Sequence, residues 1–437
     1  MRKIFDRVLD EVASKKAAGD LIYSTSKSLK LSSQLGVINE YKVSSSRILG
    51  VRVIKEGRVG ISYSEALDEE SLRLLVSQAL DNAEMSEPNF NEGILKLSGH
   101  GQDEASYPED DVDISVKTQK AILLETDVKA LDPRVVAVPH NSYSENEYEA
   151  FYLSTQGRST SYSDKSYSIV TSALLDEKGK KANFYDYNLS HTFRDLQWKK
   201  VVENSLFHAQ NLLTEQTLPT GKYNVKFTED SLKNLIECFS NFYSAKSVID
   251  KVNPWALELG EEVISKDLSI EDLPLYKDAF RVNRFDSEGV ERKPLALVKS
   301  GVLQSFYHNS STAKALGTQT TGHASRGSSS SLNISGTNLV ISGTNVKPMP
   351  PKYLEVIQMD GLHSGANRVT GDFSVAIKGY VWESGKKTMT FGNITLSGNL
   401  VELLKNVEIV GANLRSSTDH SFFSVPLMFH GLSIAGS

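Results

Sequence analysis

The sequence predicts an α+β protein of two domains, with residues 1–217 forming helices and small antiparallel sheets and residues 218–437 forming a domain dominated by β-sheet. Three observations lead to this prediction. The chain has 437 residues, which is too long for one ordinary hydrophobic core. The first half alternates helical and strand-like segments, and the second half is rich in Gly, Ser, Thr and Asn with long strand-like runs.

The first hundred residues alternate a helix, a group of strands and a second helix. Apolar residues at helical spacing predict helices over residues 4–12 and 68–85. Between them, alternating segments predict strands at residues 20–32, 34–45 and 47–64, and Gly57 lies where a hairpin turn is expected. This arrangement favours a small antiparallel sheet flanked by two helices.

A second group with the same order follows. Helical spacing recurs at residues 114–131 and from 195 to about 213, and residues 135–191 contain strand-like runs with turn signals between them. The turn-rich segment LPTGKY at 218–223 is the predicted domain boundary.

Beyond the boundary the predicted strands predominate, and helices are expected only after Thr228 and near Leu400 to Leu404. The strand-like runs lie at 295–308, 332–342, 352–360, 373–384, 388–397 and 421–434.

Composition excludes several classes of protein. The formal net charge of −6 provides no basic surface for a phosphate backbone, so no nucleic-acid partner is expected. No apolar run approaches the length of a membrane span, and the charged N-terminus does not resemble a signal peptide, which predicts a cytoplasmic protein with no membrane partner. Cys238 is the single cysteine, which excludes an internal disulfide and a cysteine zinc cluster.

The usual local motifs of catalysis are absent. The chain has no G-x-S-x-G, no phosphate-binding loop and no dinucleotide-binding G-x-G-x-x-G. No two of the nine histidines lie within nine residues of one another, so no helix presents two imidazoles one turn apart. Any metal site would have to be assembled from distant loops, and Cys238 is interpreted as a packed apolar residue without nearby groups to activate its thiol.

Three stretches remain as candidate sites, each with two interpretations. Asp286 and Glu288 are either a carboxylate pair for acid–base chemistry or the polar residues of a turn. A long loop of small residues carries His308, His323 and Arg326, and it either lines a ligand cleft or is a surface excursion. The third stretch, NRVTGDFS at 367–374, is either a ligand-gripping loop or a turn between strands.

Several segments together resemble the TldD/PmbA family. They are RILGVRVIKEGRVGISYSEALDEESLRLLVSQALDNAEMSEPN near the N-terminus and then, in order, FDSEGV, LVKSGVLQSFYHNSSTAKALG, NRVTGDFSVAIKGYVWESG and GNITLSGNLVELLKNVEIVG. The resemblance covers essentially the whole chain. It implies a metallopeptidase-type fold whose TldD-like members carry zinc on an H-E-x-x-x-H helix early in the C-terminal domain, together with a later cysteine.

The corresponding helix here, residues 230–246, contains no histidine, and no cysteine follows Cys238. The chain therefore resembles the PmbA/TldE branch, which lacks the zinc ligands and pairs with a TldD-like zinc subunit. The resemblance implies that this chain has no catalytic or metal-binding residue and no cofactor of its own. It also implies that zinc is held by the partner, and that peptide-binding residues lie at Asn367, Thr370, Gly371, Asp372, Ser374, His308 and His323.

The leading hypothesis is a non-metal subunit that completes a peptidase chamber and helps to bind peptide substrates. Two alternatives stay open at this point: a self-sufficient peptidase with a dispersed metal site, and a peptide-binding homodimer without catalysis. The family's older name, modulator of DNA gyrase, implies a link to gyrase through peptides. A paralogue with H-E-x-x-x-H in the same genome would discriminate among these hypotheses.

Overall fold

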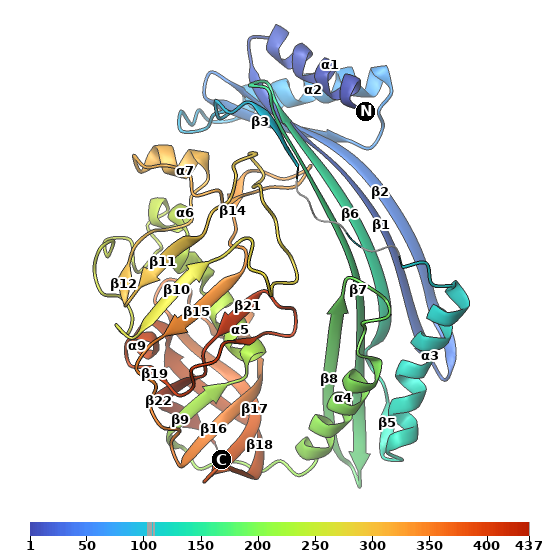
Figure 1. The fold of residues 1–437 in the computed structure, drawn as a ribbon, viewed down its shortest axis with the longest axis vertical. Helices are drawn as coiled ribbons and strands as arrows, with labels where there is room; N and C mark the ends of the chain where they lie inside the picture. The colour runs from blue at the N-terminus through green and yellow to red at the C-terminus, as the bar shows by residue number, and fades with distance from the viewer. Residues whose placement is uncertain (103–106, 108–109, 437) are drawn as a thin grey trace.

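The computed structural model describes residues 1–102, 107 and 110–436 (Figure 1). One large sheet contains every described strand of the first half, in the order β3-β2-β1-β6-β7-β4, with β5 and β8 also paired to β7. Its strands are β1 (Ala18–Gln34), β2 (Val37–Lys55), β3 (Arg58–Ser64), β4 (Gly99–Gln102), β5 (Val135–Ala137), β6 (Asn141–Ser154), β7 (Arg158–Glu177) and β8 (Lys180–Ser190).

The prediction of separate small sheets in the first half is wrong. The two predicted groups of strands join because β1 pairs antiparallel with β6 from Asp20 opposite Ser154 to Leu31 opposite Tyr143. The result is one eight-stranded sheet that curves beside the rest of the molecule (Figure 1). Local periodicity predicted the strands, but pairing between residues so distant in sequence leaves no local signal.

Helices cover the two ends of this sheet. α1 (Arg2–Ser14) and α2 (Glu69–Met85) pack at one end, where Phe5, Val12 and Leu75 are among the buried residues. α3 (Ile114–Leu131) and α4 (Trp198–Leu212) pack at the other end around a second apolar cluster (Figure 1). The helical spacing predicted from the sequence therefore corresponds to the faces that these helices bury.

The second half is built around a closed ring of strands. Its order is β18-β17-β16-β9-β22, and pairing of β18 with β22 closes the ring into a barrel, with β19 added to β22. These strands are β9 (Gly221–Phe227), β16 (Lys352–Asp360), β17 (Asp372–Glu383), β18 (Lys386–Asn399), β19 (Glu408–Ile409) and β22 (Leu427–Ala435).

A second six-stranded sheet lies against the barrel, in the order β12-β11-β10-β15-β21-β20. It comprises β10 (Leu268–Asp272), β11 (Leu295–Lys299), β12 (Val302–Leu303), β15 (Leu339–Gly343), β20 (Arg415–Ser416) and β21 (Phe422–Ser424). Outside it, β13 (Ala324–Ser325) pairs with β14 (Asn333–Ile334).

Short helices complete the second half: α5 (Glu229–Cys238), the 3₁₀ helix η1 (Ser240–Tyr243), α6 (Ala245–Ile249), α7 (Ser310–Ala315), α8 (Leu362–Gly365) and α9 (Leu400–Lys405). One apolar core joins α5, the barrel and the second sheet. The α+β class is confirmed. The division into two domains at residue 218 stays a prediction, although α4 ends at Leu212 and β9 begins at Gly221.

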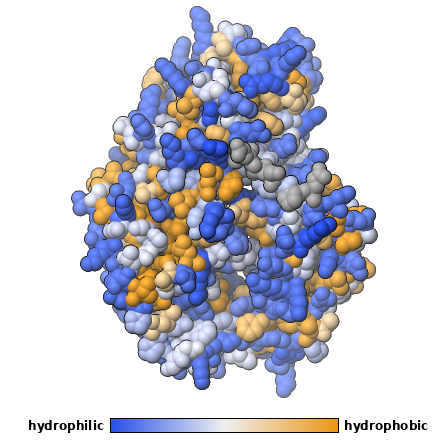
Figure 2. All heavy atoms as spheres, viewed as in Figure 1, coloured by the Kyte–Doolittle hydropathy of each residue, from blue (hydrophilic) through white to orange (hydrophobic). Residues whose placement is uncertain are grey.

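The surface drawn in Figure 2 is mainly hydrophilic, with hydrophobic side chains scattered over it. Within the described part of the chain, no helix combines the length and apolar character that crossing a bilayer requires.

Candidate functional site

The loop at 367–371 is a compact turn that leads into β17. The side-chain oxygen of Asn367 accepts hydrogen bonds from the backbone N–H groups of Val369 (3.0 Å) and Thr370 (3.3 Å). The N–H of Gly371 donates to the carbonyl of Asn367 at 2.9 Å, and Gly371 has a φ of 86°. The side chain of Asn367 therefore satisfies backbone N–H groups of the turn itself. The positive φ at residue 371 favours glycine at the end of the turn.

The side chains of Thr370, Asp372 and Ser374 are bonded to close neighbours. Asp372 accepts hydrogen bonds from the Thr370 hydroxyl (2.6 Å) and the Asn399 amide (2.8 Å), and these bonds hold the pKa of Asp372 below its usual value. The hydroxyls of Ser374 and Ser397 lie 3.0 Å apart across β17 and β18. The side chains of Thr370, Asp372 and Ser374 are exposed, and their role in peptide binding stays a prediction.

His308 and His323 lie inside the second half. The His323 side chain is fully buried, with Nδ1 2.9 Å from the Thr321 hydroxyl and Nε2 3.3 Å from an Asp272 oxygen. His308 is 5% exposed, and burial lowers its pKa to about 4. Neither ring lies at the surface, so any influence of these residues on a ligand would act through the groups that they support.

Asp272, at the end of β10, is the hydrogen-bond acceptor that links His323, Tyr307 and Thr337. Its carboxylate accepts hydrogen bonds from the Tyr307 hydroxyl (2.9 Å), from the backbone N–H of Thr337 (2.6 Å) and from the Thr337 hydroxyl. Burial favours a raised pKa for Asp272, but the contacts of His323 and Thr337 hold the pKa below its usual value. Asp272 is therefore a fixed, ionised support for the segment around Thr337.

Two adjoining cavities of about 250 and 320 Å³ lie beside Asp272, which lines the smaller one. They share four lining residues, Ser240, Tyr307, Ser335 and Gly336, so we treat them as one feature and call it the helix-side groove. One wall comes from α5, η1 and α6, and the opposite wall comes from residues 333–337, which follow β13 and lead into β15.

The helix-side groove connects several of the candidate residues. Asn241 lines the groove and donates a hydrogen bond of 2.8 Å to the backbone oxygen of Arg368, so the 367–371 turn lies against one end of η1. On the other wall, the N–H of Ser335 donates to the carbonyl of His323 at 3.0 Å. The turn and His323 therefore support opposite sides of the same groove, although neither lines it.

Sequence reasoning missed the residues that line the groove, chiefly Glu237, Ser240, Asp272, Tyr307 and Thr337. One signal was present in the sequence: the strand LSIED ends on a carboxylate at a position where the alternation of β10 expects a buried apolar residue. A carboxylate in such a position needs hydrogen-bond donors from elsewhere in the fold. The identity of those donors is not encoded locally.

Glu288 of RFDSEGV lies in a buried ionic cluster between the two halves of the chain. Asp20 of β1 accepts from Arg52 of β2 (2.6 Å) and from Arg326 (2.6 Å), and Arg52 lies 3.4 Å from Glu288. Each of these four side chains is at most 1% exposed. This cluster joins the curved sheet to loops of the second half.

The turn interpretation of RFDSEGV agrees with the backbone. The N–H of Gly289 donates to the carbonyl of Asp286 at 3.0 Å, and the N–H of Asp286 donates to the carbonyl of Val290 at 2.9 Å. Burial, reinforced by the charge of Glu288, raises the pKa of Asp286 to about 7. His323 and Arg326 belong to neighbouring buried structure, whereas residues 314–319 of the same loop are exposed.

Cys238 lies at the end of α5, partly buried against the core of the second half. Its Sγ lies 3.7 Å from the carbonyl oxygen of Leu362, which fits a weak S–H donor. This environment agrees with the interpretation of Cys238 as a packing residue.

Profiles of one protein family match nearly the whole chain. The match comprises "PmbA/TldA metallopeptidase domain 1" at residues 19–83, the "central domain" at 107–213 and the "C-terminal domain" at 220–436. The chain belongs to the PmbA/TldD family. The resemblance inferred from the motifs is thereby confirmed.

Relatives and solved structures agree with the family. A PmbA homologue of Haemophilus influenzae, named a metalloprotease, is 26% identical over 423 residues, covering 92% of this chain and 90% of that protein. The metalloprotease PmbA of Escherichia coli O157:H7 is 24% identical over 98% of this chain and 95% of that protein.

Two solved structures show the same fold. TldE from Thermococcus kodakarensis is 18% identical and has a TM-score of 0.84, covering 99% of this chain and 100% of that one. A proposed modulator of a DNA gyrase from Thermotoga maritima is 23% identical and has a TM-score of 0.85, with the same coverage.

The family's name implies a metal, but the residues around the helix-side groove do not fit a zinc site. α5 and η1 carry no histidine, and Glu237 is paired with Lys233 at 3.2 Å. Across the residues that the structure describes, no three His, Cys, Asp or Glu side chains form a group able to hold a metal ion. A zinc peptidase needs three such ligands and an open coordination position.

Proposed function

We propose that this PmbA/TldD family chain is a PmbA/TldE-like subunit without a metal of its own. It holds an extended peptide in the helix-side groove, and a TldD-like partner supplies the zinc that cleaves the peptide. The partner, the chamber that the two chains form and the peptide substrates are all parts of this proposal.

The observation that carries the proposal is the composition of the helical wall of the groove. Residues 236–241 read I-E-C-F-S-N, so aligning Glu237 with the glutamate of H-E-x-x-x-H places Ile236 and Asn241 at the two histidine positions. Glu237 lines the groove, and Asn241 donates its amide to the 367–371 turn. The wall that would carry zinc in a TldD-like chain thus has an apolar and an amide side chain here.

The opposite wall has the chemistry of a peptide-binding strand. Ser335 and Gly336 are exposed, and β14 pairs with β13 at only two positions, Asn333 and Ile334. Small side chains leave the backbone of such a segment accessible, and an extended peptide can add its own backbone hydrogen bonds to it. The groove volumes suit a few side chains of an extended peptide rather than a folded protein.

A substitution on the helical wall can fill the groove while leaving the buried Asp272 unchanged. Ser240 is exposed on the helical wall, so Ser240→Trp places a large ring in the groove, and Ser14→Trp at the exposed end of α1 is the matched control. The probe is a fluorescein-labelled pool of tryptic casein peptides, followed by fluorescence anisotropy on the full-length chain. We expect Ser240→Trp to weaken binding at least ~10-fold, because the ring and the peptide compete for one volume.

Peptide binding by Ser240→Trp that equals binding by the control would overturn the groove assignment, as would absence of binding by the native chain. Elemental analysis and a cleavage assay test whether zinc and peptide cleavage belong to the partner and not to this chain. About one zinc per chain, with cleavage by this chain alone that a chelator abolishes, would replace the proposal with the self-sufficient peptidase. Binding without cleavage, even after a TldD-like chain is added, would favour the non-catalytic scaffold.

A further inference from the structure

Three buried polar side chains line the smaller cavity of the helix-side groove: Tyr243, Tyr307 and Asp272. We call them the polar floor. Tyr307 and Asp272 are bonded to each other, with 2.9 Å between the hydroxyl and a carboxylate oxygen. Tyr243 is 3% exposed, and among the described residues no group forms a hydrogen bond with its buried hydroxyl. A buried hydroxyl without a partner destabilises a fold, so its presence beside a cavity needs a physical reason.

The side chain of Tyr243 lies on the groove side of the helical wall. Ile236, Ser240 and Tyr243 all line the smaller cavity, and their spacing of i, i+4 and i+7 places them on one helical face. Burial, followed by the charge of Asp272, raises the pKa of Tyr307, and Tyr243 adds to this shift. The hydroxyl groups of Tyr243 and Tyr307 are therefore close to each other at the polar floor.

The polar floor has one free donor and one free acceptor. Burial raises the pKa of Tyr243, so its hydroxyl keeps its proton at neutral pH and can donate. Tyr307 donates its own proton to Asp272, which leaves the Tyr307 oxygen able to accept. The carboxylate of Asp272 also accepts from the N–H and the hydroxyl of Thr337. It lies 3.3 Å from His323 Nε2 as well, so its oxygens are already occupied.

These groups discriminate among the side chains of a peptide. A carboxylate is repelled by the ionised Asp272 that forms part of the floor. An ammonium group needs acceptors for three N–H bonds, and the floor does not offer them, so the cost of burying its charge is not offset. A hydrocarbon side chain leaves the Tyr243 hydroxyl unpaired. A carboxamide carries one carbonyl acceptor and an NH₂ donor without a net charge, which matches the floor.

We propose that the polar floor is a subsite for a carboxamide side chain, that of asparagine or glutamine, in the bound peptide. The carbonyl of the side chain accepts a hydrogen bond from the Tyr243 hydroxyl, and its NH₂ group donates to the Tyr307 oxygen. The cavity of about 250 Å³ has room for one such side chain. This inference rests on the proposed function, because it assigns a side-chain preference to the same groove, with Tyr243 as the residue that determines it.

A peptide series tests the preference. The probes are fluorescein-labelled peptides of sequence Gly-Ser-Ala-X-Ala-Ser-Gly, in which X is glutamine, methionine, glutamate or lysine. Methionine matches glutamine in length but lacks the amide. Fluorescence anisotropy on the full-length chain should show the glutamine peptide binding about tenfold more tightly than the methionine peptide, as expected for a buried hydrogen bond. The glutamate and lysine peptides should also bind more weakly than the glutamine peptide.

Removal of a single oxygen atom tests the role of Tyr243. Tyr243→Phe should bind the methionine peptide as the native chain does and the glutamine peptide about tenfold more weakly, so that the preference disappears. Tyr63→Phe, at an exposed position of β3, is the matched control and should keep the native preference. In thermal melts Tyr243→Phe should not lower the melting temperature, because its hydroxyl has no partner to lose. Tyr307→Phe should lower it, because Tyr307 loses its bond to Asp272.

Ser240→Trp separates failure of this inference from failure of the proposed function. If Ser240→Trp weakens all four peptides but the native chain binds them equally, the groove holds peptide and the carboxamide subsite is wrong. If no peptide binds, or Ser240→Trp changes nothing, the groove assignment and the subsite both fail.

Three further results would overturn the subsite alone. The first is tighter binding of the glutamate or the lysine peptide than of the glutamine peptide. The second is a preference for glutamine that persists in Tyr243→Phe. The third is a melting temperature that falls as far in Tyr243→Phe as in Tyr307→Phe, since the Tyr243 hydroxyl would then have a partner in the free chain.

Discussion

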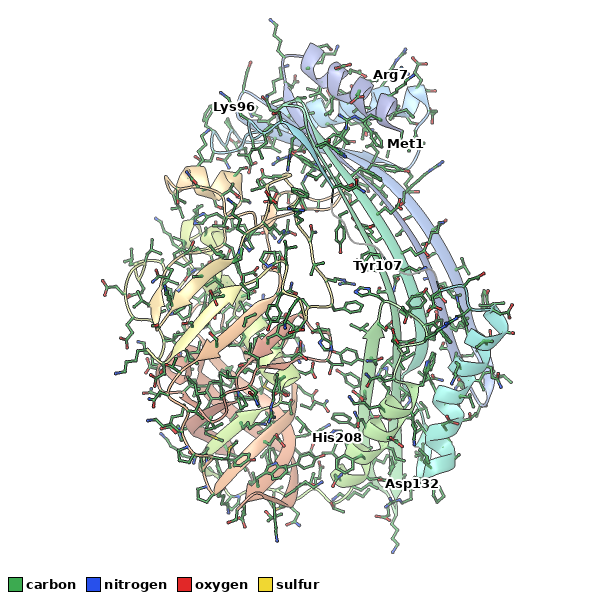
Figure 3. All side chains as sticks on the ribbon, in the orientation of Figure 1. Met1, Arg7, Lys96, Tyr107, Asp132 and His208 are labelled. Carbon is green, nitrogen blue, oxygen red and sulfur yellow. The ribbon has the colours of Figure 1, made fainter. Side chains whose placement is uncertain are left out.

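His208 shows how one half-buried side chain links the two halves of the chain. It lies on α4, on the side that faces the barrel (Figure 3). Its ring is 4.4 Å from the ring of Phe184 and 5.9 Å from that of Tyr380. Its Nδ1 lies 2.6 Å from the Tyr380 hydroxyl, on β17 of the barrel. Burial, reinforced by the positive charge of Lys387, lowers the pKa of His208 to about 4. His208 is therefore neutral in the folded protein at neutral pH.

This lowered pKa predicts a pH dependence of stability. Above the unfolded-state pKa of about 6.5 the imidazole is neutral in both states, and its contribution to stability is fully present. As the pH falls from about 6.5 towards 4, the unfolded state binds a proton that the folded state does not, so stability decreases. His308 acts in the same direction, because burial also lowers its pKa to about 4.

We expect His208→Gln, which keeps a polar side chain but does not titrate, to reduce the loss of melting temperature between pH 7 and pH 4.5. Thermal melts at several pH values measure this slope. His363→Gln is the control, since His363 is exposed on α8. An unchanged slope in His208→Gln would contradict a lowered pKa of His208 in the folded protein.

At the scale of an element, the start of β17 depends on a single backbone conformation. Gly371 has a φ of 86°, and a Cβ built there would lie 3.3 Å from Asn399 Oδ1 and 3.4 Å from Phe242. Asn399 in turn donates to the backbone oxygen of Thr370 at 2.9 Å and begins α9. The turn, the end of β18 and the start of α9 are thus held by one small group of residues.

We expect Gly371→Ala to destabilise the protein by about 1–2 kcal/mol, because residues with a Cβ avoid this conformation and the added atom meets close neighbours. Gly93→Ala is the matched control: nothing lies within 4 Å of its built Cβ, and its φ is not positive. The measurement is urea unfolding of both variants, and equal stabilities would show that the turn tolerates a side chain.

At the scale of the whole molecule, buried charges rather than apolar packing mark one junction between the sheet and the second half. Arg326 is 306 residues from Asp20 in sequence, yet the two are joined by a fully buried ion pair. Arg52 contacts both Asp20 and Glu288, so the pairs form one network. Such a network contributes specificity of docking, and loss of one member leaves a buried charge without its partner.

Asp20→Ala removes the carboxylate that both arginines share. We expect it to lower the free energy of unfolding by about 3–5 kcal/mol, since Arg326 stays buried without its ion-pair partner and Arg52 keeps only the longer contacts with Glu288 and Glu92. Asp6→Ala, which breaks an exposed ion pair with Arg2, should change stability by less than about 1 kcal/mol. Chemical unfolding of the two variants gives the comparison, and similar stabilities would show that water enters the cluster and screens it.

The sequence by itself determined the elements whose signal is local. Helices α2 and α3 and strands β16, β17 and β18 lie close to the predicted residues. The spacing of apolar residues and the turn residues at the ends of these elements are signals that can be read within a few positions of the sequence. The order of the family motifs was also readable, and it led to the correct family. The absence of paired histidines on α5 was readable too, and the branch of the family that it indicates stays a prediction.

Only the tertiary structure decided how these elements combine. It joined β1 to β6, closed the barrel through β18 and β22, buried His323 and Glu288, and placed Asp272 beneath the wall opposite α5. Each of these outcomes depends on contacts between residues far apart in sequence. Such contacts form because burial requires a partner for every backbone edge and buried charge, and no local pattern specifies which distant residue meets that requirement.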